Sequence, residues 1–370
     1  MTDLAGRSVD RRAETVPLPS APEVPLPSRT RVIRRRGVSV RVDLRSSSIC
    51  GVLALTIVAV GVWSISVGDS PIPIRDVIAT LLSHPTEDAG FVVGTLRLPR
   101  VVVAIGIGAA FGMSGAIFQS LIRNPLGSPD VIGFHSGAAL GAVSTIVWFG
   151  GSSTQVSVGA VLGGTTAALA VHALAWRRGV QAFRLVLVGI GTGFAIDAVI
   201  DHLVTRAEIE DVRRAAVWLT GSLNGRGWDE VRIVVVALAV LGPPAVVLQR
   251  HLDRLDLGDD TAAALGIRVG RTKLALVVVG VGLASLGVAA AGPVAFVAFV
   301  SGPIARRLVG STGACVVPAA FVGALVTLCA DLAARRLLAP TELPVGIMTA
   351  AVGAPYLLWL LTRQARTGAL

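Results

Sequence analysis

The sequence predicts an all-α integral membrane protein with about ten transmembrane helices. Of its 370 residues, 53% are hydrophobic and only 15% are charged, whereas ordinary globular domains are roughly 25% charged. Apolar windows of about 18 to 25 residues, each able to cross ~30 Å of hydrocarbon, recur along most of the chain after residue 48. These windows lack the apolar/polar alternation of barrel strands, so helices are expected.

The expected spans begin near residue 48. That start is too far into the chain, and too poorly flanked, for a cleaved signal peptide. The eighth span is the shortest. In order, we expect spans at 48–66, 100–121, 130–149, 156–175, 183–204, 230–248, 273–291, 293–308, 316–338 and 343–362.

Residues 1–47 differ from the rest and predict a disordered, Arg-rich cytoplasmic tail ahead of a membrane domain at 48–365. The tail holds ten arginines and five acidic residues, which gives half of the chain's net charge of +10. Such a segment cannot bury enough apolar surface to fold alone. Its basic run favours a cytoplasmic N-terminus near anionic lipid. Nucleic-acid binding is not expected, because the remainder is membrane-embedded.

Ten spans that start inside place both termini in the cytoplasm and satisfy the positive-inside rule. They also leave an unusually basic set of residues on the outer side. Such a set indicates an acidic partner there. The outer arginines are Arg97, Arg100, Arg206, Arg213, Arg214, Arg226, Arg335 and Arg336.

Two connections are longer than the others. The outer one, 205–229, has the length and tryptophans of a short interfacial helix. The inner one, 249–272, holds Asp259 and Asp260, then an alanine-rich run, then Gly266. This order is typical of a short capped helix closed by a glycine.

Glycines recur at helical spacing in several spans. Gly108 and Gly112 in the second span are one such pair, and the third and fifth spans carry others. Small-xxx-small spacing lets helix backbones approach closely. The pattern therefore predicts a compact bundle, with the alternative that some glycines line a path for cargo.

Ionisable side chains within the spans are few, and each is costly if unpaired. No spacing among them defines an acid-base pair or a metal site. The phosphate-binding loop, the zinc-protease motif and the hydrolase elbow are missing from the sequence. We therefore expect no catalytic residue, metal site or bound cofactor in this chain, so any ATP is used by a separate chain. The ionisable residues in question are His135, His172, Asp197, Asp201, His202 and Asp331.

Four sequence blocks, in order, resemble the FecCD family of ABC importer permeases, which carry iron-siderophore, haem or cobalamin complexes. The resemblance covers about residues 50–365. The blocks are "LRLPR" with "GAAFGMSGAIFQSLIRNPLGSPDVIGFHSGAALGA" (96–142), "WLTGSL" (218–223), "AAALGIRV" (262–269) and "ELPVGIMTAAVGAPYLLWLL" (342–361).

The resemblance implies a type II ABC importer bundle with defined partners. Two permease subunits, identical or homologous, form the path, two ATPase subunits lie on the cytoplasmic side, and an extracytoplasmic binding protein docks from outside. By motif, Arg97 and Arg100 of "LRLPR" and Arg335 of "DLAAR" are implied to meet glutamates of that binding protein. Arginine suits this role because its planar fork pairs a carboxylate at two points.

The inner loop is implied to contact the ATPase. This contact is assigned to residues 253–269, and in particular to Asp259, Asp260, Ala264, Leu265, Gly266 and Ile267.

The path is implied to be lined by the second, fifth and eighth spans. Residues assigned to path or packing are Gly108, Gly112, Gln119, Asn124 and Pro125. Gly302-Pro303 stands where many relatives have Pro-His, so any role of that histidine does not apply here.

The expected function is therefore the permease of a bacterial inner-membrane importer for a ferric siderophore. The blocks "SGPIARR" and "ELPVG" are most similar to permeases for catecholate siderophores. An importer of cobalamin or haem is the main alternative, because the motifs are shared. An ion-coupled transporter using Asp197, Asp201 or Asp331, and a structural scaffold, are alternatives from other classes.

Overall fold

The computed structural model describes residues 30–35, 38–68, 70–82, 90–124, 127–129, 133–175 and 182–366. Pro125 and most of the segment 1–47 lie outside these residues. The chain divides into two compact units, Met1–Arg45 and Ser46–Leu370. Within the first unit, strands β1 (Thr30–Arg35) and β2 (Val38–Asp43) form an antiparallel hairpin in which Thr30 pairs with Asp43. The sequence predicts disorder for this segment.

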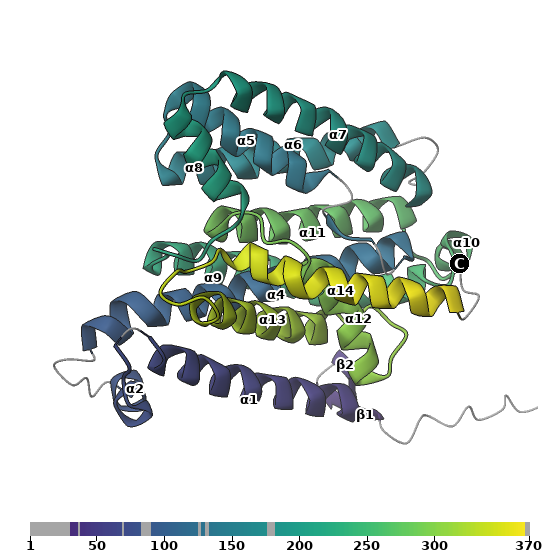
Figure 1. The fold of residues 1–370 in the computed structure, drawn as a ribbon. Helices are drawn as coiled ribbons and strands as arrows, with labels where there is room; N and C mark the ends of the chain where they lie inside the picture. The colour runs from purple at the N-terminus through teal and green to yellow at the C-terminus, as the bar shows by residue number, and fades with distance from the viewer. Residues whose placement is uncertain are drawn as a thin grey trace, which may run out of the picture. The chain divides into compact units, whose positions relative to one another are not determined.

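The second unit is helical, and each of the ten expected spans corresponds to a helix (Figure 1). Among the described residues, seven helices are long and apolar enough to cross a membrane. The shorter ones are α5, α12 and the apolar part of α14. The ten helices are α1 (Leu44–Ser66), α4 (Leu98–Ile122), α5 (Phe134–Phe149), α6 (Ser153–Ala175), α7 (Ala182–Arg206), α9 (Trp228–Leu255), α11 (Val269–Ala291), α12 (Val297–Val309), α13 (Val316–Arg336) and α14 (Val345–Arg366).

Four short elements lie between the spans: α2 (Ile74–Leu81), the π-helical segment η1 (Val92–Arg97), α8 (Ile209–Leu219) and α10 (Asp259–Ala264). In Figure 1, α8 and α2 lie at one end of the bundle and α10 at the other. We call these the outer and inner ends, following the expected orientation. The helices α8 and α10 fall within the two long connections. However, α9 continues to Leu255 rather than ending near 248, because Leu252 and Leu255 are buried in the core.

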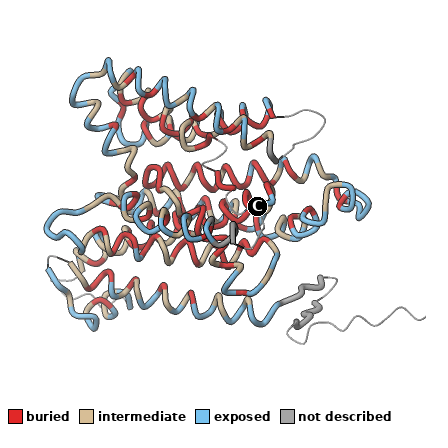
Figure 2. The backbone as a smooth tube through the Cα atoms, turned by 45° about the vertical axis from the view of Figure 1, so that its right-hand side comes forward, coloured by how far each residue is buried: buried red, intermediate tan, exposed pale blue. Residues whose placement is uncertain are grey.

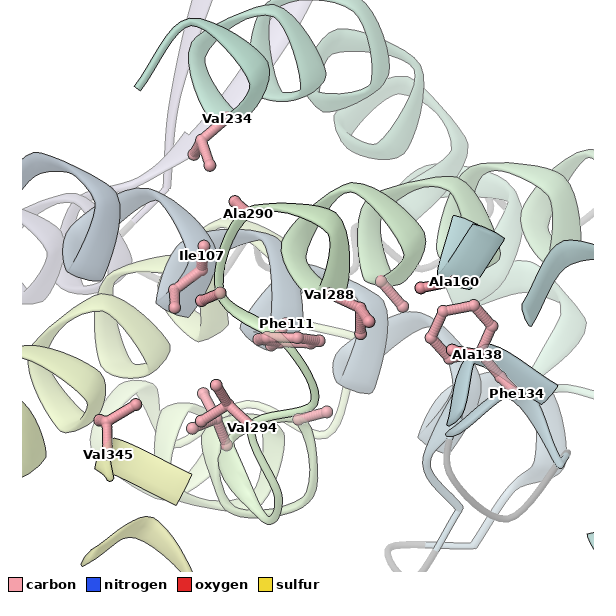
Figure 3. Packing of buried hydrophobic residues seen from close by; sticks show 14 of the residues in the cluster. Ile107, Phe111, Phe134, Ala138, Ala160, Val234, Val288, Ala290, Val294 and Val345 are labelled. Carbon is pink, nitrogen blue, oxygen red and sulfur yellow. The ribbon is translucent and has the colours of Figure 1, made fainter. Parts of the chain in front are cut away.

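Helix α4 is the centre of the bundle. It packs against α9, α11, α12 and α13, and most of its residues are buried, as the red tube in the middle of Figure 2 shows for the centre of the bundle. Figure 3 shows Phe111 of α4 beside Val288 of α11 and Val294 of the following loop. The second span is expected to line a path between two subunits, and in this structure most of its residues are covered by other helices of the same subunit.

Glycines make the closest helix contacts. A Cβ added to Gly108 or Gly112 would collide with backbone atoms of α13, at Gly323 and Ala319 respectively. In the same way, Gly141 of α5 meets Gly159 of α6. Close approach increases the van der Waals contact between helices that lipid cannot drive together. The structure thus places Gly108 and Gly112 in packing contacts rather than at an open surface.

Candidate functional site

The outer end is organised around a fully buried carboxylate, Asp331 of α13. Its Oδ1 lies 3.0 Å from Nη2 of Arg100, and its Oδ2 lies 3.2 Å from Nε of Arg335. Arg100 also forms a 3.1 Å ion pair with Glu342, whose side chain is 39% exposed. An isolated charge is costly to bury, so the carboxylate of Asp331 is paired with both guanidinium groups. These ion pairs hold the two arginine side chains in place. We call Arg100, Asp331, Arg335 and Glu342 the outer network.

Arg97 and Arg335 also bind the first helix and the loop that follows it. Arg97 donates hydrogen bonds of 2.7 Å to the carbonyl oxygens of Ile65 and Ser70, and Arg335 donates to Ser64 Oγ. The π-helical segment η1 ends at Arg97, directly before α4. The sequence suggested that these arginines need an acidic partner from another chain, whereas two of them already have acids within this one.

The three docking candidates line one cavity. Arg97, Arg100 and Arg335 surround a space of about 510 Å³, together with Arg226 and Glu342. A second outer cavity, of about 820 Å³, shares Arg226 and Glu342 and adds two arginines and Trp218 from α8. The outer end is therefore hollow and rich in arginine. The sequence pattern places these arginines on one side. The role of Asp331 was not predicted, although its spacing of one helical turn from Arg335 is a signal for such a pair.

The inner end carries α10 as the expected short helix. Gly266 adopts a positive φ of 83°, and the amides of Gly266 and Ile267 donate to the carbonyls of Ala263 and Ala262, which is the Schellman arrangement. Leu265 is 57% exposed, and Asp260, Ala264 and Gly266 are exposed too. Ile267, in contrast, is 7% exposed, so the expectation that it presents itself to a partner is wrong.

Asp259 fastens α10 to the bundle. Its Oδ2 lies 2.6 Å from Nζ of Lys273 on α11, and its Oδ1 lies 3.1 Å from Nη2 of Arg123 at the end of α4. Arg123 also donates to the carbonyl oxygen of Leu255, the last residue of α9. The same carboxylate was expected to contact the ATPase. In this structure it joins α10 to α4 and α11.

Gln119 lies deeper in the inner half. It is 2% exposed; its Nε2 donates to the carbonyl of Phe299, and its Oε1 accepts from Arg306 at 3.0 Å. A Cβ at Gly302 would displace the side-chain oxygen of Gln119, so the glycine leaves room for this amide. Both Gly302 and the next residue, Pro303, are buried. This pair therefore makes room for an intramolecular polar contact between α4 and α12.

Two further residues complete the inner end. The backbone N–H of Asn124 donates to the backbone carbonyl of Gln119, and the backbone carbonyl of Asn124 accepts from the N–H of Gly127. Asn124 therefore shapes the chain after α4. Beyond α9, burial and the neighbouring Asp253 raise the pKa of Asp256, against an opposing effect of Arg123. Polar groups are thus concentrated where α4 and α9 end.

The ionisable residues of α7 form no comparable cluster. Asp197, Asp201 and His202 are exposed along that helix. Within the described part of the chain, no group of three His, Cys, Asp or Glu residues could hold a metal ion. Asp331, the third carboxylate considered for ion coupling, is held between two arginines. The polar chemistry of the described residues therefore gathers at the two ends of the bundle.

The fold and its two polar ends define a multi-pass membrane transport subunit. The chain belongs to the FecCD transport family, whose model matches residues 55–363. The family resemblance drawn from the four sequence blocks is thereby confirmed.

Relatives and a solved structure agree with this assignment. The chain is 41% identical over 317 residues to the ferric enterobactin transport system permease protein FepG of Escherichia coli (strain K12), covering 86% of this chain and 96% of FepG. It is 37% identical to the achromobactin transport system permease protein CbrC of Dickeya dadantii (strain 3937), covering 90% and 96% of the two chains. An inward-facing metal-chelate type ABC transporter matches with a TM-score of 0.76 and 26% identity, over 86% of this chain and 99% of that one.

Proposed function

We propose that this chain is the permease subunit of a bacterial ABC importer that carries a ferric siderophore, of the catecholate type, across the cytoplasmic membrane. Family membership over residues 55–363 is the observation that carries the proposal. The catecholate class is supported by the 41% identity to a ferric enterobactin permease. Iron enters as cargo, within its chelate, and ATP is consumed by separate ATPase subunits.

The outer network supports docking of a loaded binding protein. Glu342 is partly exposed and holds Arg100 by one ion pair. A glutamate on the binding protein can replace Glu342 at the same guanidinium without leaving Arg100 unpaired, because Asp331 remains in place beneath it. Docking is therefore an exchange of carboxylates, and the arginines are oriented for it in advance.

The inner end supports coupling to an ATPase. Leu265 and Asp260 are exposed on α10, and Asp259 joins that helix to α4 and α11. A movement of the ATPase that displaces α10 is therefore passed to the long helices. The long helices then move as a rigid body against a second permease subunit, and this movement opens and closes the path between the two subunits.

Uptake of radioactive iron tests the proposal. A strain that lacks the chain, and the same strain complemented with it, are offered ferric complexes of a catecholate, a hydroxamate and citrate, and separately haem and cobalamin. We expect complementation for the ferric catecholate alone. Uptake of cobalamin or haem instead would replace the proposed cargo. Uptake that stops with a protonophore, but continues after ATP depletion, would identify an ion-coupled transporter.

A further inference from the structure

A cavity at the inner end is lined by four basic side chains. It has a volume of about 380 Å³ and lies where α9 ends, α11 begins and the residues after α10 pass between them. Arg254 and His251 come from α9, Arg268 precedes α11, and Arg271 lies in its first turn. Arg254 and Arg268 lie within the segment 253–269 that is expected to contact the ATPase, whereas His251 and Arg271 were assigned no role.

The cavity has no acidic counterpart. Neither aspartate nor glutamate is among its lining residues. Arg254, Arg268 and Arg271 are exposed. Within the described part of the chain, they form no ion pair. The nearby carboxylate of Asp259 is occupied by Arg123 and Lys273 instead. Three guanidinium groups are thus directed to one hollow without a neutralising group, which favours an anion.

His251 contributes a further basic side chain to the lining. Its Nδ1 is buried and has no hydrogen-bond partner among the described residues. Because that nitrogen is not accessible from the cavity, recognition of an anion depends on the three guanidinium groups.

An apolar surface leads from the cavity toward the middle of the bundle. On α9, Val247 lies one turn before His251 and is 63% exposed. On α11, Leu274 and Val278 follow Arg271 at spacings of three and seven residues and are 42% and 52% exposed. Since α9 and α11 pack together, both helices carry exposed apolar side chains next to the cavity. A ligand with a phosphate head and hydrocarbon chains matches both parts.

We infer that this cavity binds the headgroup of an anionic phospholipid, with its acyl chains along α9 and α11. Basic pockets between transmembrane helices on the cytoplasmic side bind phosphate headgroups of this kind. The lipid contacts Leu265 and Gly266, which line the cavity beside α10. It therefore braces the element proposed to contact the ATPase. Binding itself does not depend on the proposed function, whereas an effect on coupling does.

Native mass spectrometry of the full chain tests this inference. The probes are cardiolipin and phosphatidylglycerol, with phosphatidylcholine as a neutral reference and inorganic phosphate as a competitor. The variant carries Arg254→Gln, Arg268→Gln and Arg271→Gln. The matched control carries Arg75→Gln, Arg213→Gln and Arg232→Gln, which removes three exposed arginines at the outer end.

We expect the wild type and the control to retain the anionic lipids, and the cavity variant to bind them about 100-fold more weakly. Each arginine near an anionic headgroup contributes about fivefold. Equal lipid retention by the cavity variant would overturn the inference. Displacement by millimolar inorganic phosphate would identify a small-anion site instead. Loss of a co-purified ATPase subunit, with lipid binding unchanged, would assign the arginines to an acidic surface of that subunit.

A Lys-substituted variant at the same three positions separates charge from folding. It keeps the positive charges, so we expect it to retain more lipid than the Gln variant. If the Lys and Gln variants lose lipid equally while their melting temperatures match the wild type, headgroup charge is not what the cavity recognises. The uptake assay remains a separate measurement, so a failure of the lipid site and a failure of the importer assignment are distinguishable.

Discussion

Arg100 of α4 and Asp331 of α13 form a 3.0 Å ion pair, in which the carboxylate is fully buried and the guanidinium is 14% exposed. The pair joins the central helix to its most extensive neighbour at the outer end. Arg335 completes the arrangement from one turn further along α13. Docking chemistry and helix packing therefore depend on the same carboxylate.

Replacing this carboxylate should destabilise the protein. Asp331→Asn leaves two arginines without their buried acid, and loss of one partner of a buried pair costs about 3–5 kcal/mol. We expect a lower melting temperature of the purified chain. Asp229→Asn is the control, because the ion pair of Asp229 with Arg232 is exposed on both sides and such pairs contribute little. Equal melting of the two variants would contradict the role given to Asp331.

Removing the exposed acid of the outer network, Glu342, should strengthen docking of the binding protein. Glu342→Gln frees one edge of Arg100 while Asp331 still orients it. We expect the binding protein to associate several-fold more tightly, about 1 kcal/mol or roughly fivefold, in a surface-plasmon assay on the reconstituted subunit. Glu210→Gln removes an acid that lines only the neighbouring cavity and serves as the control. Weaker docking of Glu342→Gln would mean that Glu342 itself contacts the partner.

Close packing at Gly112 gives a prediction about folding. Gly112→Val places a side chain against the backbone of Ala319 in α13, and overpacking of this kind costs about 1–3 kcal/mol or more. We expect a large loss of folded protein in size-exclusion chromatography. Gly51→Val is the matched control, since a Cβ at Gly51 meets no atom within 4 Å. A monodisperse Gly112→Val protein would show that α4 and α13 can separate.

Asp259 should hold α10 in place. Asp259→Asn weakens the contacts to Arg123 and Lys273, so amide hydrogen exchange in residues 259–267 should accelerate while the rest of the chain is unchanged. Asp260→Asn changes the adjacent, exposed carboxylate and should leave exchange as in the wild type. If both variants exchange alike, the ion pairs of Asp259 do not order the helix.

Two apolar residues after α10 should behave differently. Leu265→Asp alters an exposed side chain, so we expect loss of the co-purified ATPase subunit with little change in the melting temperature of the permease. Ile267→Asp introduces a charge at a buried position and should lower that melting temperature by burying an unpaired carboxylate. Retention of the ATPase by the Leu265 variant would place the coupling contact elsewhere.

The sequence predicted the helices well because each span needs a long apolar run, and that requirement is visible residue by residue. Gly266 likewise marked the end of α10 correctly, since a positive φ favours glycine. The surroundings of the second span could not be predicted from its composition, because lipid-facing and core helices are equally apolar. Only contacts distinguish α4, most of whose residues are buried, from α7, which exposes Phe194 and Leu187.

The sites at the two ends of the bundle were predicted only in part, because contacts between residues far apart in the chain are not visible in the sequence. Charge and motif placed Arg97, Arg100 and Arg335 on one side, but no local pattern indicated that Asp331 would reach Arg100, which lies 231 residues away in the chain. Asp259 and Ile267 were assigned to the partner because a short loop does not reveal which residues face inward. Their inward contacts arise from α4 and α11, which approach α10 only after the bundle has formed.

The central helix runs from Leu98 to Ile122 with no proline beyond Pro99 in its first turn, about 37 Å at 1.5 Å per residue. Prolines lie inside α9, α12 and α14 instead, at Pro243, Pro244, Pro303 and Pro355. Because proline removes a backbone hydrogen bond and permits a kink, we expect bending during transport to occur in those three helices. The central helix α4 is then expected to stay straight while α9, α12 and α14 change shape around it.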